Sequence, residues 1–150
     1  MDKDILFNQV KTYRKETLEI THDVTEVEAN IIPNGFHNNI RWNLGHIYLD
    51  QYLWIQAVTR EKKEGLDHFN KWFGFGTSPA DFTNSTPTMS ELKQLLVEQP
   101  NDILARYSHR LNEPFEPTEM GIYTIEQVLI RTIYHEGLHA ATIKTLKRFI

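Results

Sequence analysis

Two histidines near the end of the chain are the residues best placed to do chemistry. They stand in the segment YHEGLHAATIK, residues 134–144, where His135 and His139 are four positions apart. On a helix, residues at this spacing share one face, with Cβ atoms about 5–6 Å from each other. Two such imidazoles can bind one ion at zinc–nitrogen distances of about 2.0–2.1 Å. The spacing therefore predicts part of a metal site or, alternatively, two core histidines with hydrogen-bond partners of their own.

The letters HEGLH also fit the H-E-x-x-H pattern of zinc proteases. A protease of this kind needs a further ligand downstream, but no acidic residue follows His139. The extended metzincin pattern asks for Gly and His at the positions of Thr142 and Thr145. The chain also contains no strand-like alternation that would build a sheet above the motif helix. We therefore interpret the motif as H-x-x-x-H.

A third ligand must come from another helix, and His46 in RWNLGHIYLD is the best candidate. It follows Gly45 and shares an apolar helical face with Trp42 and Leu49. The alternative is a core histidine bonded to a carboxylate such as Asp50. Three converging histidines would leave open positions for water or substrate. The other histidines are weaker candidates: His22, His37, His68 and His109.

Composition narrows the classes of protein further. The chain has no cysteine, which excludes disulfides, thiolate metal sites and a cysteine nucleophile. The formal net charge is −4 and no sustained basic stripe is present, so we expect no nucleic-acid partner. No segment approaches the roughly 18 apolar residues of a membrane span, and the charged N-terminus lacks a signal-peptide pattern. We expect a soluble cytoplasmic protein without a membrane partner.

Apolar periodicity predicts an all-α protein with four long helices. Pro33 and Gly35 end the first helix, capping boxes at Thr88 and Thr124 open the last two, and Pro100 should kink or interrupt the third. The expected ranges are about 2–29, 38–59, 88–111 and 124–149. Within a single domain spanning residues 1–150, four such helices imply a four-helix bundle.

The long connection between the second and third helices, residues 61–87, is rich in aromatic residues and should not be disordered. Long loops inside compact domains often form lids or pocket walls, and we expect this one to do so. Its aromatic residues are Phe69, Trp72, Phe73, Phe75 and Phe82.

Two segments resemble the DinB-like (damage-inducible) superfamily. NNIRWNLGHIYLDQYLW is similar to that family's second-helix signature, and HEGLHAATIKTLKR is similar to its closing segment. The resemblance extends over the whole chain in length, helix order and histidine placement. It implies a four-helix bundle, often a homodimer, that binds nickel, zinc or another divalent ion through His46, His135 and His139. One departure is Ala141-Thr142, where many members have Gly-Gln.

The resemblance also implies an activity, because some relatives are transferases or isomerases that use bacillithiol, mycothiol or glutathione. A shell of three neutral histidines leaves the ion's charge uncompensated, so the ion favours a thiolate or lowers the pKa of water towards about 7. We therefore predict a metal-dependent thiol S-transferase or small hydrolase, with a low-molecular-weight thiol or another small molecule as partner. The alternative is a non-catalytic metal-binding or stress-response module in which the ion is structural.

Several residues could assist the metal ligands. Glu136 could act as a base or support a ligand, although a solvated surface carboxylate is at least as good an interpretation. Asp50, Tyr48 and Tyr134 are further candidates for supporting contacts. The apolar circumference of the second helix, together with the aromatic connection, suggests a homodimer. Cationic residues that could hold an acidic substrate are Arg41, Arg131 and Lys144.

Overall fold

The chain folds into helices alone, and a computed structural model describes all 150 residues. The predicted all-α class is confirmed. None of the helices combines the length and apolar character needed to cross a membrane. The α-helices are α1 (Lys3–Ile20), α2 (Glu26–Ala29), α3 (Ile40–Thr59), α4 (Leu66–Phe73), α5 (Met89–Tyr107) and α6 (Ile125–Leu146), and two 3-10 turns span Pro79–Asp81 and Lys147–Phe149.

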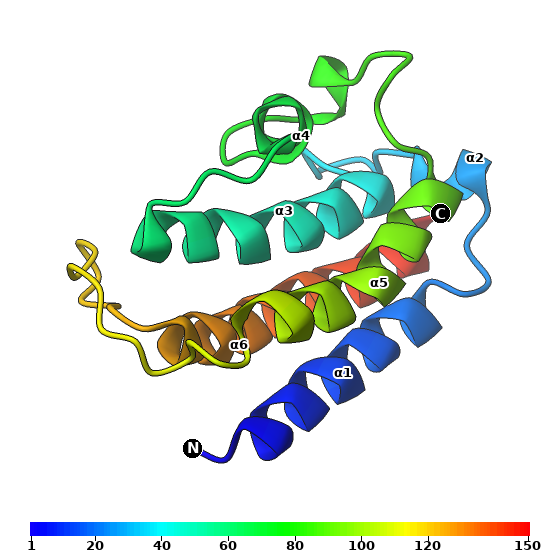
Figure 1. Cartoon of the computed structure of the whole chain (residues 1–150). Helices are drawn as coiled ribbons and strands as arrows, with labels where there is room; N and C mark the ends of the chain where they lie inside the picture. The colour runs from blue at the N-terminus through cyan, green and yellow to red at the C-terminus, as the bar shows by residue number, and fades with distance from the viewer.

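The four long helices pack side by side around one apolar core. α6 packs against both α1 and α3, and α5 packs against the same two helices (Figure 1). α3 is the most buried of them, as its apolar circumference predicts, and α3 and α6 form the closest pair. This pairing places His46 on α3 opposite the two histidines of α6.

The first helix is shorter than predicted, because capping chemistry interrupts the apolar periodicity. α1 ends at Ile20, and the Thr21 hydroxyl bonds back to the carbonyls of the preceding turn. Thr25 then adopts an extended backbone and forms a capping box with Glu28, which opens the short helix α2. The prediction of one helix reaching Ala29 was therefore wrong.

α5 continues through Pro100, so of the kink or interruption that was expected there the interruption does not occur, and the helix ends at Tyr107 rather than near Leu111. Proline has no backbone N–H, so the carbonyl of Leu96 loses its partner within the helix. The Arg14 guanidinium of α1 replaces that partner, since its Nη1 donates to the Leu96 oxygen at 2.8 Å. A buried side chain thus compensates for the proline.

The aromatic connection contains a helix of its own. α4 packs on α3, on the side away from α1, and carries Phe73 into the core (Figure 1). This contact depends on Gly45, because a Cβ there would lie 2.3 Å from the Phe73 ring. The glycine before His46 is therefore needed for α4 to seat on α3.

Replacing Gly45 with alanine should destabilise the fold by about 1–3 kcal/mol, because the added methyl forces the Phe73 ring out of place. Gly137 on α6 is the matched control, since a Cβ there would meet no atom within 4 Å. Gly137→Ala should be neutral or stabilising by up to about 1 kcal/mol, as expected for helix propensity. Urea denaturation of both variants measures the difference. Equal stabilities would contradict the close packing at Gly45.

Candidate metal centre

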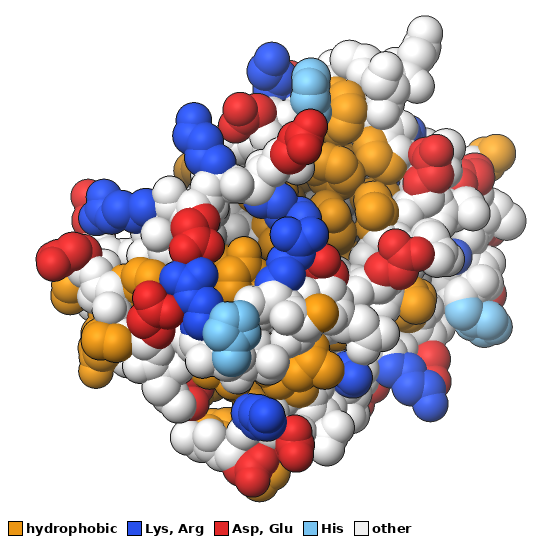
Figure 2. Space-filling model, viewed as in Figure 1, with side chains coloured by type: hydrophobic (Ala, Val, Ile, Leu, Met, Phe, Trp, Pro, Cys, Tyr) orange, Lys and Arg blue, Asp and Glu red, His pale blue; other side chains and the backbone are white.

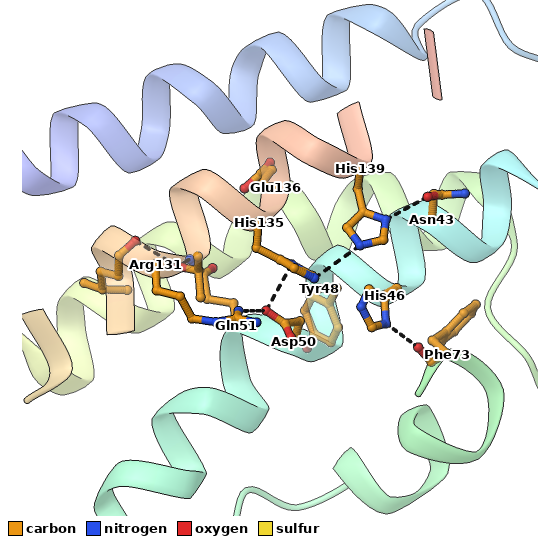
Figure 3. Close-up of polar contacts among 12 residues, drawn as sticks. Asn43, His46, Tyr48, Asp50, Gln51, Phe73, Arg131, His135, Glu136 and His139 are labelled. Carbon is orange, nitrogen blue, oxygen red and sulfur yellow. Dashed lines mark hydrogen bonds and ion pairs between the residues drawn. The ribbon is translucent and has the colours of Figure 1, made fainter. Parts of the chain in front are cut away.

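Three imidazoles converge between α3 and α6 (Figure 3). His46 comes from α3, and His135 and His139 come from successive turns of α6. One potential ligand nitrogen from each ring lies within 4.8 Å of the others. The ring centroids are 4.5–5.1 Å apart. The structure thus brings the three predicted histidines into one group that could hold a metal ion.

Each of the three rings has its Nδ1 against an oxygen acceptor. The pairs are His46 with the Phe73 carbonyl at 2.6 Å, His135 with Asp50 Oδ2 at 3.1 Å, and His139 with Asn43 Oδ1 at 2.8 Å. The contacts of His46 and His139 are hydrogen bonds, and because an amide or carbonyl oxygen only accepts, they favour the tautomer in which Nδ1 carries the proton and donates it. The contact between His135 Nδ1 and Asp50 Oδ2 is close but lacks hydrogen-bond geometry. In this tautomer Nε2 of His46 and Nε2 of His139 each have a free lone pair, which is the arrangement of metal-binding histidines.

The geometry of the two α6 rings fits a bound cation. Nε2 of His135 and Nε2 of His139 are 3.2 Å apart. If both Nδ1 atoms are protonated, two nitrogen lone pairs face each other at this distance and repel unless a cation lies between them. Three imidazole nitrogens suit zinc, nickel and related transition metals better than magnesium or calcium, which prefer oxygen ligands.

Burial keeps the α6 histidines neutral. Desolvation, reinforced by the charge of a protonated His46, lowers the pKa of His135 to about 4. The same two causes, in the same order, lower the pKa of His139 to about 3. Both rings are therefore uncharged near neutral pH, the state in which imidazole binds a metal.

Asp50 links the centre to Arg131. Its Oδ2 lies 3.1 Å from His135 Nδ1 and 2.5 Å from Arg131 Nη1. The Arg131 guanidinium also stacks over the Trp54 ring at 4.2 Å. Arg131 is thus engaged with Asp50 and Trp54 rather than free to hold an acidic substrate.

Replacing Asp50 with asparagine should weaken metal binding about 10–100-fold, as is typical when the partner of a ligating histidine is lost. Asp102 offers a control, because it pairs with Tyr52 and Arg106 and has no contact with the three histidines. Competition with a coloured chelator would measure both affinities. Equal losses for Asp50→Asn and Asp102→Asn would mean that Asp50 has no special role at the metal.

Glu136 pairs with Arg14 of α1. Arg14 Nε lies 2.8 Å from Glu136 Oε1, and Arg14 Nη2 lies 3.2 Å from Oε2. Both side chains are buried, with Arg14 2% and Glu136 5% exposed. In Figure 3, Glu136 points away from the imidazoles. The carboxylate is therefore not solvated, and its two oxygens are engaged by Arg14.

The sequence analysis did not single out Arg14, although its position on the apolar face of the first helix could have identified it. It lies four residues after Val10 and three before Thr17, on the buried stripe of α1. A charged residue at such a position needs a buried partner of opposite charge. Arg14 also bonds the Leu96 carbonyl of α5 and Gln51 Oε1 of α3, so it contacts all three other long helices.

Tyr48 and Tyr134 make no hydrogen bond to the histidines. Tyr48 is two residues after His46, a rotation of roughly 200° around the helix, and it packs against Tyr52 and Phe69 instead. Tyr134 is 70% exposed. No hydrogen bond therefore supports the prediction that these tyrosines hold the three histidines in place.

A cavity of about 550 Å³ opens onto the three histidines. Trp42 stacks on the His46 ring at 4.7 Å and, through Nε1, donates to the Thr77 hydroxyl. Phe75, from the aromatic connection, is among the lining residues, but its side chain is fully exposed, so the connection as a pocket wall stays a prediction. Thr142, where the chain departs from the DinB-like pattern, also lines it.

The remaining candidates contribute little to this cavity. Of the four weaker histidines, only His37 lines it, and His68 lies beside Trp72 at a separate hollow. Arg41 donates to the carbonyls of Thr86 and Pro87 and so ties the aromatic connection to α3. Lys144 is absent from the lining. The structure therefore places no predicted cation where it could hold an acidic substrate at the metal.

Comparison with known proteins agrees with the all-helical fold. The sequence profile of the DinB superfamily matches residues 9–143, so the chain belongs to the DinB superfamily. The fold is similar to the crystal structure of a conserved protein from Enterococcus faecalis, with a TM-score of 0.71 and 14% identity, over 100% of this chain and 97% of that one. At this identity the likeness shows the fold alone. No curated protein matches the chain.

Proposed function

We propose that this protein is a metal-dependent enzyme that activates a thiol or a water molecule at His46, His135 and His139. One observation carries the proposal: each ring has its Nδ1 against an acceptor oxygen, which leaves three Nε2 atoms for one ion. The adjoining cavity supports a catalytic site, because a purely structural ion needs no space for a substrate. A thiol S-transferase or a small hydrolase is the reaction class that suits this arrangement.

Nickel or zinc is the proposed ion, since three neutral imidazoles without a carboxylate or thiolate suit these metals. A divalent ion held there would favour the deprotonated form of a thiol or water, making its sulfur or oxygen a better nucleophile. The residues of the chain orient the site. Asp50, Asn43 and the Phe73 carbonyl hold the rings, and Trp42 covers one face of His46.

The second candidate is a structural ion in a non-catalytic module. It is favoured by the position of the histidines, which join α3 and α6, the most closely packed pair of helices. Such an ion would have a closed shell and would resist an added ligand.

Thermal melts separate the two candidates. For an open site, a small neutral thiol such as 2-mercaptoethanol should raise the unfolding midpoint of the metal-loaded protein by about 5 °C at roughly 100 times its dissociation constant. After chelation the same thiol should have no effect. A large drop in midpoint on chelation, with no response of the loaded protein to thiols, would instead favour the structural ion.

We also propose a homodimer, supported by an apolar stripe on the exposed face of α6. Ile130, Tyr134 and Leu138 lie four residues apart and are 44%, 70% and 50% exposed. Light scattering coupled to size exclusion tests this. The wild type should have twice the chain mass and Tyr134→Lys should have a reduced mass, whereas a monomeric wild type would contradict the proposal.

A further inference from the structure

The cavity at the three histidines differs in charge from the face of the protein drawn in Figure 2. Acidic and basic side chains are interspersed over the face drawn in Figure 2. By contrast, none of the 13 residues that line the cavity is Asp, Glu, Lys or Arg. A ligand that enters the cavity therefore meets no fixed carboxylate, ammonium or guanidinium.

Most charged side chains near the histidines in sequence are already paired. Asp50 and Arg131 pair with each other, and Glu136 pairs with Arg14 inside the core. Arg41 is bound to backbone carbonyls. Lys144 makes no ion pair, but it does not line the cavity.

The exposed surface of the cavity is mostly apolar, and the cavity is large enough for an organic molecule. The volume of about 550 Å³ lies within the usual range of about 300–1,000 Å³ for small-molecule sites. Asn38 and Thr142 are among the uncharged polar lining residues. The apolar side chains of the lining are Phe36, Trp42, Phe75, Leu138 and Leu146.

We propose that the ligand of this site is a thiol with an uncharged, apolar body, such as an aryl or alkyl chain, and that its sulfur is its only ionised group. The proposal rests on the proposed function, because an ion at the three histidines would receive the sulfur. That ion would attract an anionic head, and the lining offers no second charged group for the body of the ligand. A charged group that packed against the lining would lose part of its water and find no oppositely charged partner among the aromatic and aliphatic side chains.

Two thiols of the same size test the proposal. 4-Methylbenzyl mercaptan and 4-(mercaptomethyl)benzoate share the sulfur and the ring, and differ by a methyl group against a carboxylate. Calorimetric titration of nickel-loaded protein should give a dissociation constant about tenfold or more lower for the methyl compound. The amount of nickel bound per chain is measured beforehand by equilibrium dialysis.

A pair of variants locates the effect. Thr142 and Thr145 are both exposed on α6, and both hydroxyls bond only to their own helix, but only Thr142 lines the cavity. Thr142→Lys should shift the preference towards the carboxylate compound by about tenfold, because it adds the missing cation. Thr145→Lys should leave the preference unchanged.

Each outcome has one meaning. Nickel-loaded protein that binds the carboxylate compound as tightly as the methyl compound, or that binds neither, would overturn the neutral-ligand proposal and leave the metal site standing. The same holds if Thr142→Lys and Thr145→Lys behave alike. Protein that takes up no nickel or zinc would overturn the proposed function, and this proposal would fall with it.

Discussion

Replacing Arg14 with methionine should cost about 3–5 kcal/mol of unfolding free energy, because it leaves a buried carboxylate without its counter-charge. Glu136 is 5% exposed and has no other ion-pair partner. The substitution also orphans the Leu96 carbonyl, which Pro100 cannot serve. Urea denaturation followed by circular dichroism would measure the loss.

Two further variants make this result specific. Arg106→Met breaks the surface pair with Asp102, in which the arginine side chain is 57% exposed, and should cost about 0–1 kcal/mol. The double variant Arg14→Met with Glu136→Leu removes both charges and should recover much of the loss. If Arg14→Met costs no more than Arg106→Met, the buried pair does not hold the helices as described.

Replacing His46 with alanine should weaken metal binding by more than about 100-fold, beyond the usual effect of losing a ligand's hydrogen-bond partner. His46 is the only member of the three-histidine group that comes from α3, so its loss would leave an ion with the two α6 histidines alone. Competition titration of zinc and nickel against a coloured chelator measures the change.

His37 provides the control for this prediction, because it lines the same cavity but is not one of the three converging histidines. His37→Ala should bind metal within about threefold of the wild type, since substitutions away from the ligands and their partners have small effects. Comparable losses in His37→Ala and His46→Ala would show that the ion lies elsewhere in the cavity.

The histidine group could be predicted from sequence because it depends on local spacing. His135 and His139 share a helical face by their separation, and His46 lies on the apolar face of a helix whose core position is evident from composition. The capping boxes at Thr88 and Thr124 likewise predicted the residues at which α5 and α6 begin.

The contacts that support the ligands could not be predicted, because they join residues far apart in the chain. The acceptor for His46 is a backbone carbonyl at the end of α4, a helix that lay in an expected loop. The setting of Glu136 could not be predicted either, because one residue along a helix is a rotation of about 100°, which turns it from the face of His135 towards α1. Its partner Arg14 is 122 residues away.

Metal content tests the central claim most directly. Plasma mass spectrometry on untagged, natively purified protein should find about one equivalent of nickel, zinc or another divalent ion per chain. The ion should be lost from His46→Ala, His135→Ala and His139→Ala alike. A wild type that contains no metal and cannot be loaded with any divalent ion would contradict the account, and the three histidines would then be core residues.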